Sequence, residues 1–437
     1  MNYKKIHLST KTAFLLGFLG DLGIGLNNFA MSIYSAYVAE QNGLIEGQIS
    51  FWVGMVATGW GITYCISPVL FGHISDKIGR RTSLQLSMIG FLFSNLFIVF
   101  FASTPIHLLI ANMNSGLFYG FYWPVLGAYL SETGEIIKRH DKNISFFMVS
   151  WSLGLTIGPI FGGVDWLDLK IPFYILIFVC IAAIMIVRKS ILSNSEIESI
   201  KQSGDDPESE NIGIETTPND NTLAIARKNG DYHPDIKLHK KQRTFLIFTI
   251  ICGATFFSFN NQIIFTLFPE YALDNLTFNT GILLPIGAKM TAAILTTAIG
   301  LMRTLSFWLA GNPKDRTKEK LMMISLGGMA ISMIFVFFIS EAIVLFFIFV
   351  LYGFSSGFSF VIGEILLLKL SRTGKGLKAG IYESVVGIAF FLSTFLSGFI
   401  AQANAANPYL LGGLVTLAAF FALLILYVRK QKVTETG

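Results

Sequence analysis

The chain has 437 residues, of which 53% are hydrophobic and 14% are charged, and its formal net charge is +5. Soluble globular chains carry about 25% charged residues, so this composition places the chain among membrane proteins. Its basic residues are dispersed over short segments, which excludes the clustered basic surface of a nucleic-acid-binding protein.

Apolar stretches recur along the chain, and each is long enough to cross a bilayer. About 20 mostly apolar residues span the hydrocarbon core, and they must be helical because lipid offers no partners to backbone polar groups. The pattern predicts an all-α membrane protein of 12 transmembrane helices in two pseudo-symmetric six-helix bundles, 1–187 and 244–430. The predicted spans are 12–37, 50–71, 83–102, 107–130, 143–163, 171–187, 244–270, 282–309, 321–340, 342–369, 379–402 and 408–428.

The positions of the basic residues predict the orientation. Lys and Arg are retained on the cytoplasmic side of a membrane. If both termini are cytoplasmic, most of the 32 Lys and Arg residues fall in cytoplasmic segments. These segments are 1–11, 72–82, 131–142, 188–243, 311–320, 371–378 and 429–437.

The long segment 188–243 separates the two sets of spans. It is rich in charged residues, Ser, Asn, Gly and Pro, and shows no apolar periodicity. Such a composition predicts a disordered cytoplasmic linker between the halves. We interpret it as a tether, with a regulatory role as the alternative.

The two halves also resemble each other. The first span contains GLNNFAMS and the seventh contains SFNNQIIF, so the pairs Asn27–Asn28 and Asn260–Asn261 lie at similar depths. Parallel six-helix repeats are one way in which secondary transporters are built, and the substrate site then lies where the halves meet. We therefore expect a central site between the bundles.

The run GHISDKIGRR at residues 72–81 resembles the loop signature G-x-x-x-D-[RK]-x-G-R-[RK] of the major facilitator superfamily. The 12 predicted spans and their division into sixes are similar to that family as well. The resemblance implies that Asp76 docks against the start of the eleventh span, and that Arg80 pairs with Asp76 and with Glu132. The charges would hold the cytoplasmic side closed. The expected cytoplasmic gate comprises Gly72, Asp76, Gly79, Arg80, Arg81, Glu132, Asp315, Arg316, Glu364 and Glu383.

Ionisable and polar residues inside the spans need a reason, since a charge at the bilayer centre costs about 3 kcal/mol on insertion scales. Asp21 shares one helix face with Gly25, Asn28 and Ser32, and we predict that it carries the coupling proton; a buried hydrogen bond between helices is the alternative. Arg303 could bind an anionic substrate or neutralise a carboxylate. The expected substrate-cavity residues are Asn27, Asn28, Asn112, Tyr119, Trp123, Asn260, Asn261 and Arg303.

The fifth span contains GLTIGPIFGG, which resembles the signature G-x-x-x-G-P-x-x-G-G of proton-linked antiporters in the superfamily. The fourth-span signature R-x-x-x-G-x-x-x-G of these antiporters is changed, because Asn112 stands at the position of its arginine. Either the proton route uses Asp21 with another partner, or proton coupling is absent. The fifth-span motif residues are Gly154, Gly158, Pro159, Gly162 and Gly163.

No nucleotide-binding loop, metal-ligand cluster or nucleophile motif occurs in the sequence, so we expect neither an enzyme nor a metal or other cofactor. We predict a monomeric secondary transporter in the plasma membrane, whose partners are a small-molecule substrate, protons and the lipid bilayer. Export of drug-like or metabolite compounds is favoured by the fifth-span motif. The alternatives are uptake of sugars or organic anions and, in another class, a non-transporting membrane sensor.

Overall fold

The computed structural model describes the backbone of residues 2–136, 140–164, 168–202, 240–277, 287–310, 315–370 and 375–435. Within these ranges the chain forms 12 long helices and one short helix, α7. The helices are α1 (Asn2–Gln41), α2 (Glu46–Ile78), α3 (Arg80–Phe101), α4 (Pro105–Ile136), α5 (His140–Gly162), α6 (Ile171–Ser190), α7 (Asn194–Gln202), α9 (Lys240–Asn275), α10 (Ala288–Leu309), α11 (Asp315–Phe338), α12 (Ala342–Leu370), α13 (Lys375–Ala401) and α14 (Asn407–Glu435).

The predicted all-α membrane fold is confirmed. In the described part of the chain, 10 helices are long and apolar enough to cross a membrane. The two exceptions are α5, whose described apolar part Phe146–Gly162 is shorter, and α4. Several helices continue well past the predicted spans, as α1 does by starting at Asn2, because polar residues mark the edge of the lipid and not the end of a helix.

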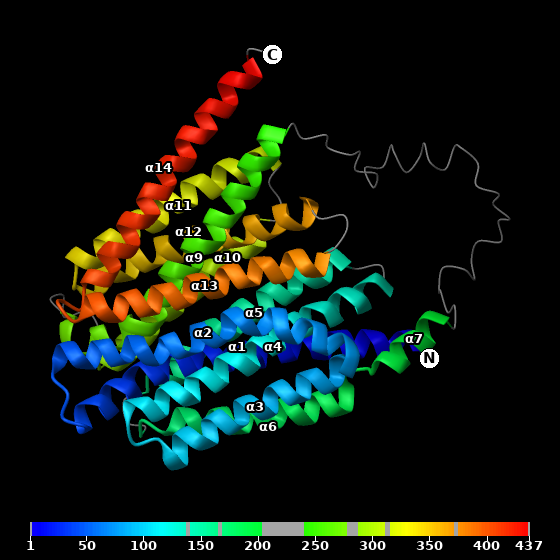
Figure 1. The fold of residues 1–437 in the computed structure, drawn as a ribbon, viewed down its shortest axis with the longest axis horizontal. Helices are drawn as coiled ribbons and strands as arrows, with labels where there is room; N and C mark the ends of the chain where they lie inside the picture. Colours follow the sequence, from blue (N-terminus) through cyan, green and yellow to red (C-terminus); the bar gives the residue numbers. More distant parts are fainter. Residues whose placement is uncertain are drawn as a thin grey trace.

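The long helices form two groups that lie side by side (Figure 1). Helices α1–α6 make up the lower group in this view and α9–α14 the upper group. The groups meet along two seams, where α2 packs against α13 and α5 packs against α10. Because each seam joins one helix of each half, movement of the halves relative to each other would change the contacts along both seams.

The α2–α13 seam is built from small residues that let the two backbones come close. A Cβ atom on Gly54 would lie 2.5 Å from the Cα of Gly398, and one on Gly387 would lie 2.5 Å from the Cα of Cys65. The Thr58 hydroxyl donates a hydrogen bond to the Thr394 hydroxyl across the same seam, at 3.1 Å. Small residues at helix contacts are typical of membrane proteins, where close packing replaces the hydrophobic effect as the driving force.

The two ends of the molecule differ in charge. The basic end carries the junction of α2 and α3, with Lys77 and Arg81, and the positively charged end of α6. At the opposite end the halves are in contact, since the Ser50 hydroxyl of α2 donates to the Glu270 carboxyl of α9 at 2.9 Å. Phe29 and Val53 of the first half belong to the same hydrophobic cluster as residues of α9–α14. The opposite end is therefore closed in this structure.

The segment expected to be a linker starts with ordered structure. Helix α7 follows α6, and Glu196 of α7 forms an ion pair with Lys5 of α1, with 2.6 Å between Oε1 and Nζ. Ile197 is buried against the first bundle. Residues 203–239 of the expected linker lie outside the described residues.

Candidate functional site

A group of polar side chains lies buried between the halves, and Asp21 of α1 is its acidic member. Its side chain is 1% exposed, and its Oδ1 accepts a hydrogen bond from the Tyr119 hydroxyl of α4. Its second oxygen, Oδ2, has no hydrogen-bond partner among the described residues. A buried carboxyl group with one unused oxygen can bind and release a proton or contact a ligand.

Arg303 of α10 is the basic member of this group and is fully buried. Its Nη1 donates to the Asn261 side-chain oxygen of α9 at 3.1 Å, and its Nε donates to the Ser152 hydroxyl of α5 at 3.4 Å. Its Nη2 has no hydrogen-bond partner among the described residues. The guanidinium carbon lies 5.2 Å from the centre of the Trp151 ring and 5.7 Å from that of Phe265, so aromatic faces flank the charge.

Asp21 and Arg303 attract each other from opposite halves without forming a direct ion pair. Each lies within the electrostatic range of the other. Among the described residues, Lys5–Glu196 and Arg80–Glu132 are ion pairs with an N···O distance of 4.0 Å or less, and Asp21–Arg303 is not such a pair. Asp21 and Arg303 are therefore farther apart than a direct ion pair. The structure therefore places one buried carboxyl group and one buried guanidinium group in the same region, each with an atom that has no hydrogen-bond partner among the described residues.

Aromatic side chains surround this group. The Trp151 ring stacks on Phe307 at 5.5 Å and on Phe360 at 5.6 Å between centroids, and both partners belong to the second half. Trp123 meets Trp151 edge-on at 6.1 Å and Tyr119 at 6.4 Å. These rings join the halves around the Asp21 and Arg303 side chains.

The expected cavity asparagines divide into two sets. Asn27 donates to Asn112 at 3.4 Å, and Asn112 donates to the Val56 carbonyl at 2.9 Å, so both bridge helices within the first half. Asn260 donates to the Thr416 hydroxyl of α14 at 2.7 Å and thereby bridges helices within the second half. Asn28 is half-buried, and among the asparagines expected in the cavity Asn261 alone is hydrogen-bonded to Arg303 in the described part of the structure.

Part of the expected cytoplasmic gate is visible at the basic end. Gly79 connects α2 to α3 with φ 87°, a backbone conformation that favours glycine. Arg80 forms an ion pair with Glu132 of α4 at 2.9 Å and donates to the Ser75 hydroxyl at 2.7 Å. The Arg81 guanidinium donates to the Arg188 carbonyl. The surroundings of Gly72, Asp76, Asp315, Arg316 and Glu364 lie outside what the structure describes.

Two contacts between acidic residues and the other half frame the central group. Glu383 of α13 accepts a hydrogen bond from the Tyr64 hydroxyl of α2 at 3.0 Å, and Tyr64 stacks on Trp60 with 4.6 Å between centroids. Glu270, which accepts from Ser50, was not among the residues expected from the sequence. Glu270 is the last residue of the predicted seventh span, and α9 continues beyond it to Asn275. An acidic residue within a span is energetically costly, and this signal in the sequence could have identified Glu270 as a candidate.

The fifth-span motif residues contact neighbouring helices directly. A Cβ atom on Gly154 would overlap the Phe18 carbonyl of α1, and one on Gly158 would overlap the Leu26 amide of the same helix. A Cβ on Gly163 would overlap Ala293 of α10. The glycines thus permit the close approach of α5 to α1 and to the second half.

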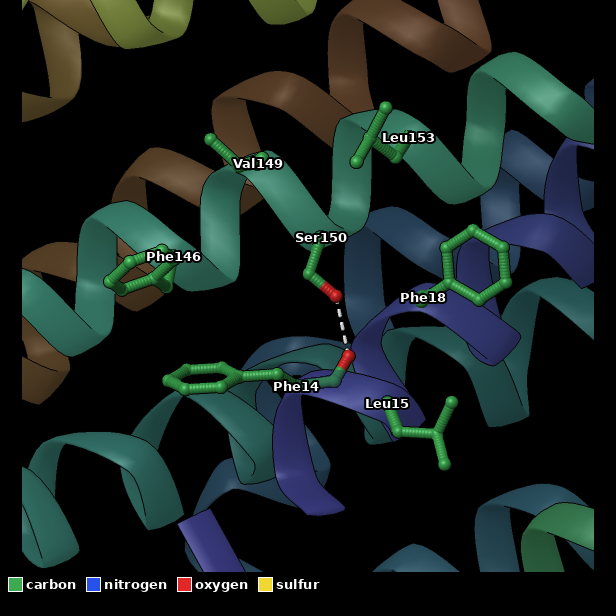
Figure 2. Close-up of a pocket in the computed structure, with 7 residues that line it drawn as sticks. All are labelled: Phe14, Leu15, Phe18, Phe146, Val149, Ser150 and Leu153. Atoms are coloured by element: carbon green, nitrogen blue, oxygen red, sulfur yellow. Dashed lines mark hydrogen bonds between the residues drawn. The ribbon is translucent and has the colours of Figure 1, made fainter. Parts of the chain in front are cut away.

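Two hollows on the described surface lie away from the central group and do not include Asp21 or Arg303. A shallow groove of about 270 Å³ lies between α1 and α5. It is lined by apolar side chains and by Ser150, whose hydroxyl donates to the Phe14 carbonyl (Figure 2). Such a lining offers little to recognise a polar solute. A second hollow of about 240 Å³ lies at the basic end, where Lys77 and Arg81 face the start of α7.

Comparison with known proteins identifies the family. The family model described as Major Facilitator Superfamily matches residues 13–361. The chain is 28% identical over 111 residues to the putative metabolite transport protein YaaU of Escherichia coli, which is 25% of each chain. It is 27% identical over 212 residues to the tetracycline resistance protein, class B, of Escherichia coli, covering 48% of this chain and 49% of that one. The matched segments thus span between a quarter and about half of these relatives.

Solved structures share the fold. The crystal structure of a D-xylose-proton symporter matches with a TM-score of 0.67 and 17% identity, covering 94% of this chain and 96% of the other. The predicted resemblance is therefore confirmed over nearly the whole fold: the chain belongs to the major facilitator superfamily, a family of transporters and not of enzymes.

Proposed function

We propose that this chain is a proton-coupled secondary transporter of a small solute, and that it acts as a monomer in the plasma membrane by alternating access. The observation that carries the proposal is the buried Asp21 carboxyl group, whose Oδ1 accepts a hydrogen bond from Tyr119 and whose Oδ2 has no hydrogen-bond partner among the residues that the structure describes. A group that binds a proton within the membrane, between the two halves, can link proton movement to a change of shape.

The seams provide a basis for alternating access. Contacts such as Ser50 with Glu270 and Tyr64 with Glu383 join the halves in the closed structure. They would break in turn when one end or the other opens. At the basic end, docking of Asp76 against the start of α13 remains part of this proposal, with both termini in the cytoplasm.

Export of the solute in exchange for entering protons is the form of coupling favoured by the fifth-span resemblance and by the similarity to the tetracycline resistance protein. Helix packing is another explanation of the fifth-span motif, because Gly154 and Gly158 lie directly against α1. Uptake together with protons is the second candidate, and it is favoured by Arg303, a buried cation whose Nη2 has no hydrogen-bond partner in the described part of the chain.

The test uses purified full-length protein in liposomes. A thermal-shift screen against a solute library selects the solute that stabilises the protein most, and its radiolabelled form is then measured in two assays. In the first, a pH gradient drives accumulation; one pH unit stores about 1.4 kcal/mol, enough for about tenfold accumulation at one proton per solute. In the second, exchange is measured without a gradient.

Asp21→Asn should abolish accumulation driven by the pH gradient and retain exchange, because the amide keeps the shape of the carboxyl group and cannot carry the proton. Asp274→Asn, which changes an exposed acidic residue at the end of α9, is the matched control and should retain both activities. Accumulation in Asp21→Asn at the level of the unmodified protein would refute Asp21 as the proton carrier.

A further inference from the structure

Arg303 has hydrogen-bonding capacity that the described protein does not use. A guanidinium group carries five N–H donors. Asn261 and Ser152 accept from Nη1 and Nε, while Nη2 has no partner among the described residues, and the side chain is fully buried. Burying a charged donor without an acceptor is costly, so a buried cation of this kind is best explained by a negatively charged partner that binds there.

The carboxyl group of Asp21 does not serve as that partner in this structure. It lies within electrostatic range of Arg303, but the two do not form a direct ion pair. Its Oδ1 is occupied by the Tyr119 hydroxyl. The region therefore contains a cation that is not directly neutralised.

The walls next to Arg303 are aromatic. The faces of Trp151 and Phe265 flank the guanidinium group at 5.2 and 5.7 Å. Phe360 stacks on Trp151 and also lies 4.5 Å from Phe257, between ring centroids. A ligand whose charge reaches Arg303 would have its remaining atoms beside apolar ring faces.

From these contacts we propose that Arg303 forms the anion subsite of the transport site, and that the substrate is a small monocarboxylate with a flat or apolar body. A planar guanidinium matches the planar carboxylate, and the ring faces match the body. One unpartnered nitrogen on one cation fits a single negative charge better than the higher charge of a phosphate ester.

This substrate class has a consequence for coupling, which rests on the proposed role of Asp21 as proton carrier. An ionised Asp21 and a bound carboxylate would place two negative charges near one Arg303. Binding is therefore strongest when Asp21 holds a proton, so proton and carboxylate should travel together in the same direction. This favours the second candidate of the proposed function, uptake together with protons, over export in exchange for protons. The groups that share the surroundings of Asp21 are Tyr119 and Tyr122 of α4, Tyr64 of α2, Trp151 of α5 and Arg303 of α10.

The first test measures binding to the purified full-length protein in detergent at pH 6, by tryptophan fluorescence, with matched probes. Benzoate and hexanoate are compared with the neutral amides benzamide and hexanamide. Benzylamine serves as the positively charged probe, and phenyl phosphate as the probe of higher negative charge. We expect the carboxylates to bind at least about tenfold more tightly than the matching amides. Equal binding of the amides, or tighter binding of benzylamine or phenyl phosphate than of benzoate, would overturn the proposal.

The second test uses variants of the same helix. Arg303→Gln should weaken benzoate binding by at least about tenfold, and Arg303→Lys should restore part of it. Lys289→Gln is the matched control, since Lys289 is also a buried cation of α10 but donates to the Val164 carbonyl, away from this site. If Arg303→Gln does not fold, the comparison of acids with amides in the unmodified protein still decides.

The pH dependence separates this proposal from the proposed function. In the unmodified protein, benzoate affinity should fall by up to about tenfold per pH unit above the range in which Asp21 titrates, and in Asp21→Asn this dependence should vanish. Binding that requires Arg303 but shows no such dependence supports the anion subsite and contradicts the coupling through Asp21. Loss of pH-driven transport in Asp21→Asn without carboxylate binding supports the coupling and contradicts the subsite.

Discussion

The hydrogen bond from Ser50 to Glu270 tests whether contacts between the halves set the balance between open and closed forms. Ser50 belongs to α2 and Glu270 to α9, and the two polar atoms are 2.9 Å apart. Both side chains are buried, at 2% and 8% exposure, so water does not compete strongly for the bond. The contact can exist only while the end opposite the basic end is closed.

Ser50→Ala removes the donor and leaves the Glu270 carboxyl group without the hydrogen bond from Ser50. Loss of one hydrogen bond to such a group costs about 1–3 kcal/mol, which corresponds to a shift of about 5- to 150-fold in the closed-to-open equilibrium. When this end opens, water can replace the lost donor, so the cost falls on the closed form. The variant should therefore favour opening at this end.

The assay is a distance measurement between spin labels at Ile45 and Ala403, two exposed positions at this end in opposite halves. The native cysteines are first replaced, and the label distances are compared in the variant and the parent protein. Ser35→Ala is the matched control, because Ser35 is a buried serine whose hydroxyl bonds to carbonyls of its own helix. An unchanged distance distribution in Ser50→Ala, or an equal shift in the control, would refute the reasoning.

Two further variants test the packing and the seam. Gly158→Val should lower the thermal stability of the purified protein by about 1–3 kcal/mol or prevent its assembly, because a side chain there would overlap α1; Gly127→Ala, where an added Cβ would lie 3.9 Å from Phe147, should leave stability nearly unchanged. Tyr64→Phe should reduce transport by removing the donor to Glu383, and unchanged transport would show that this contact does not hold the seam.

Much of the central site could be predicted from residue type alone. Asp21 and Arg303 stood out because charges within apolar spans are costly and therefore need a function or a partner. Tyr119 and Asn261 were also expected near the centre, and the structure places both in contact with these two groups. The rule that a charge within an apolar span needs a function or a partner uses only the residue type and the position of the span, so it requires no knowledge of the tertiary structure.

The partners could not be predicted in the same way. Ser152, Trp151 and Phe265 contact Arg303 from other helices, and a helical period does not tell which helix faces which. The same limit applies to asparagine, because Asn260 and Asn261 are adjacent in the sequence. One bonds to α14 and the other to Arg303, a difference decided by the rotation of α9 against its neighbours.

The sequence by itself determined the class of the protein: apolar length requires helices in lipid, and the repeated set of six spans predicts two bundles. The tertiary structure alone decided which charges share a site, because Asp21 and Arg303 are far apart along the chain and belong to different halves. Only the packing of α1 and α10 on either side of α5 brings them into the same buried region, where the two groups can influence each other electrostatically.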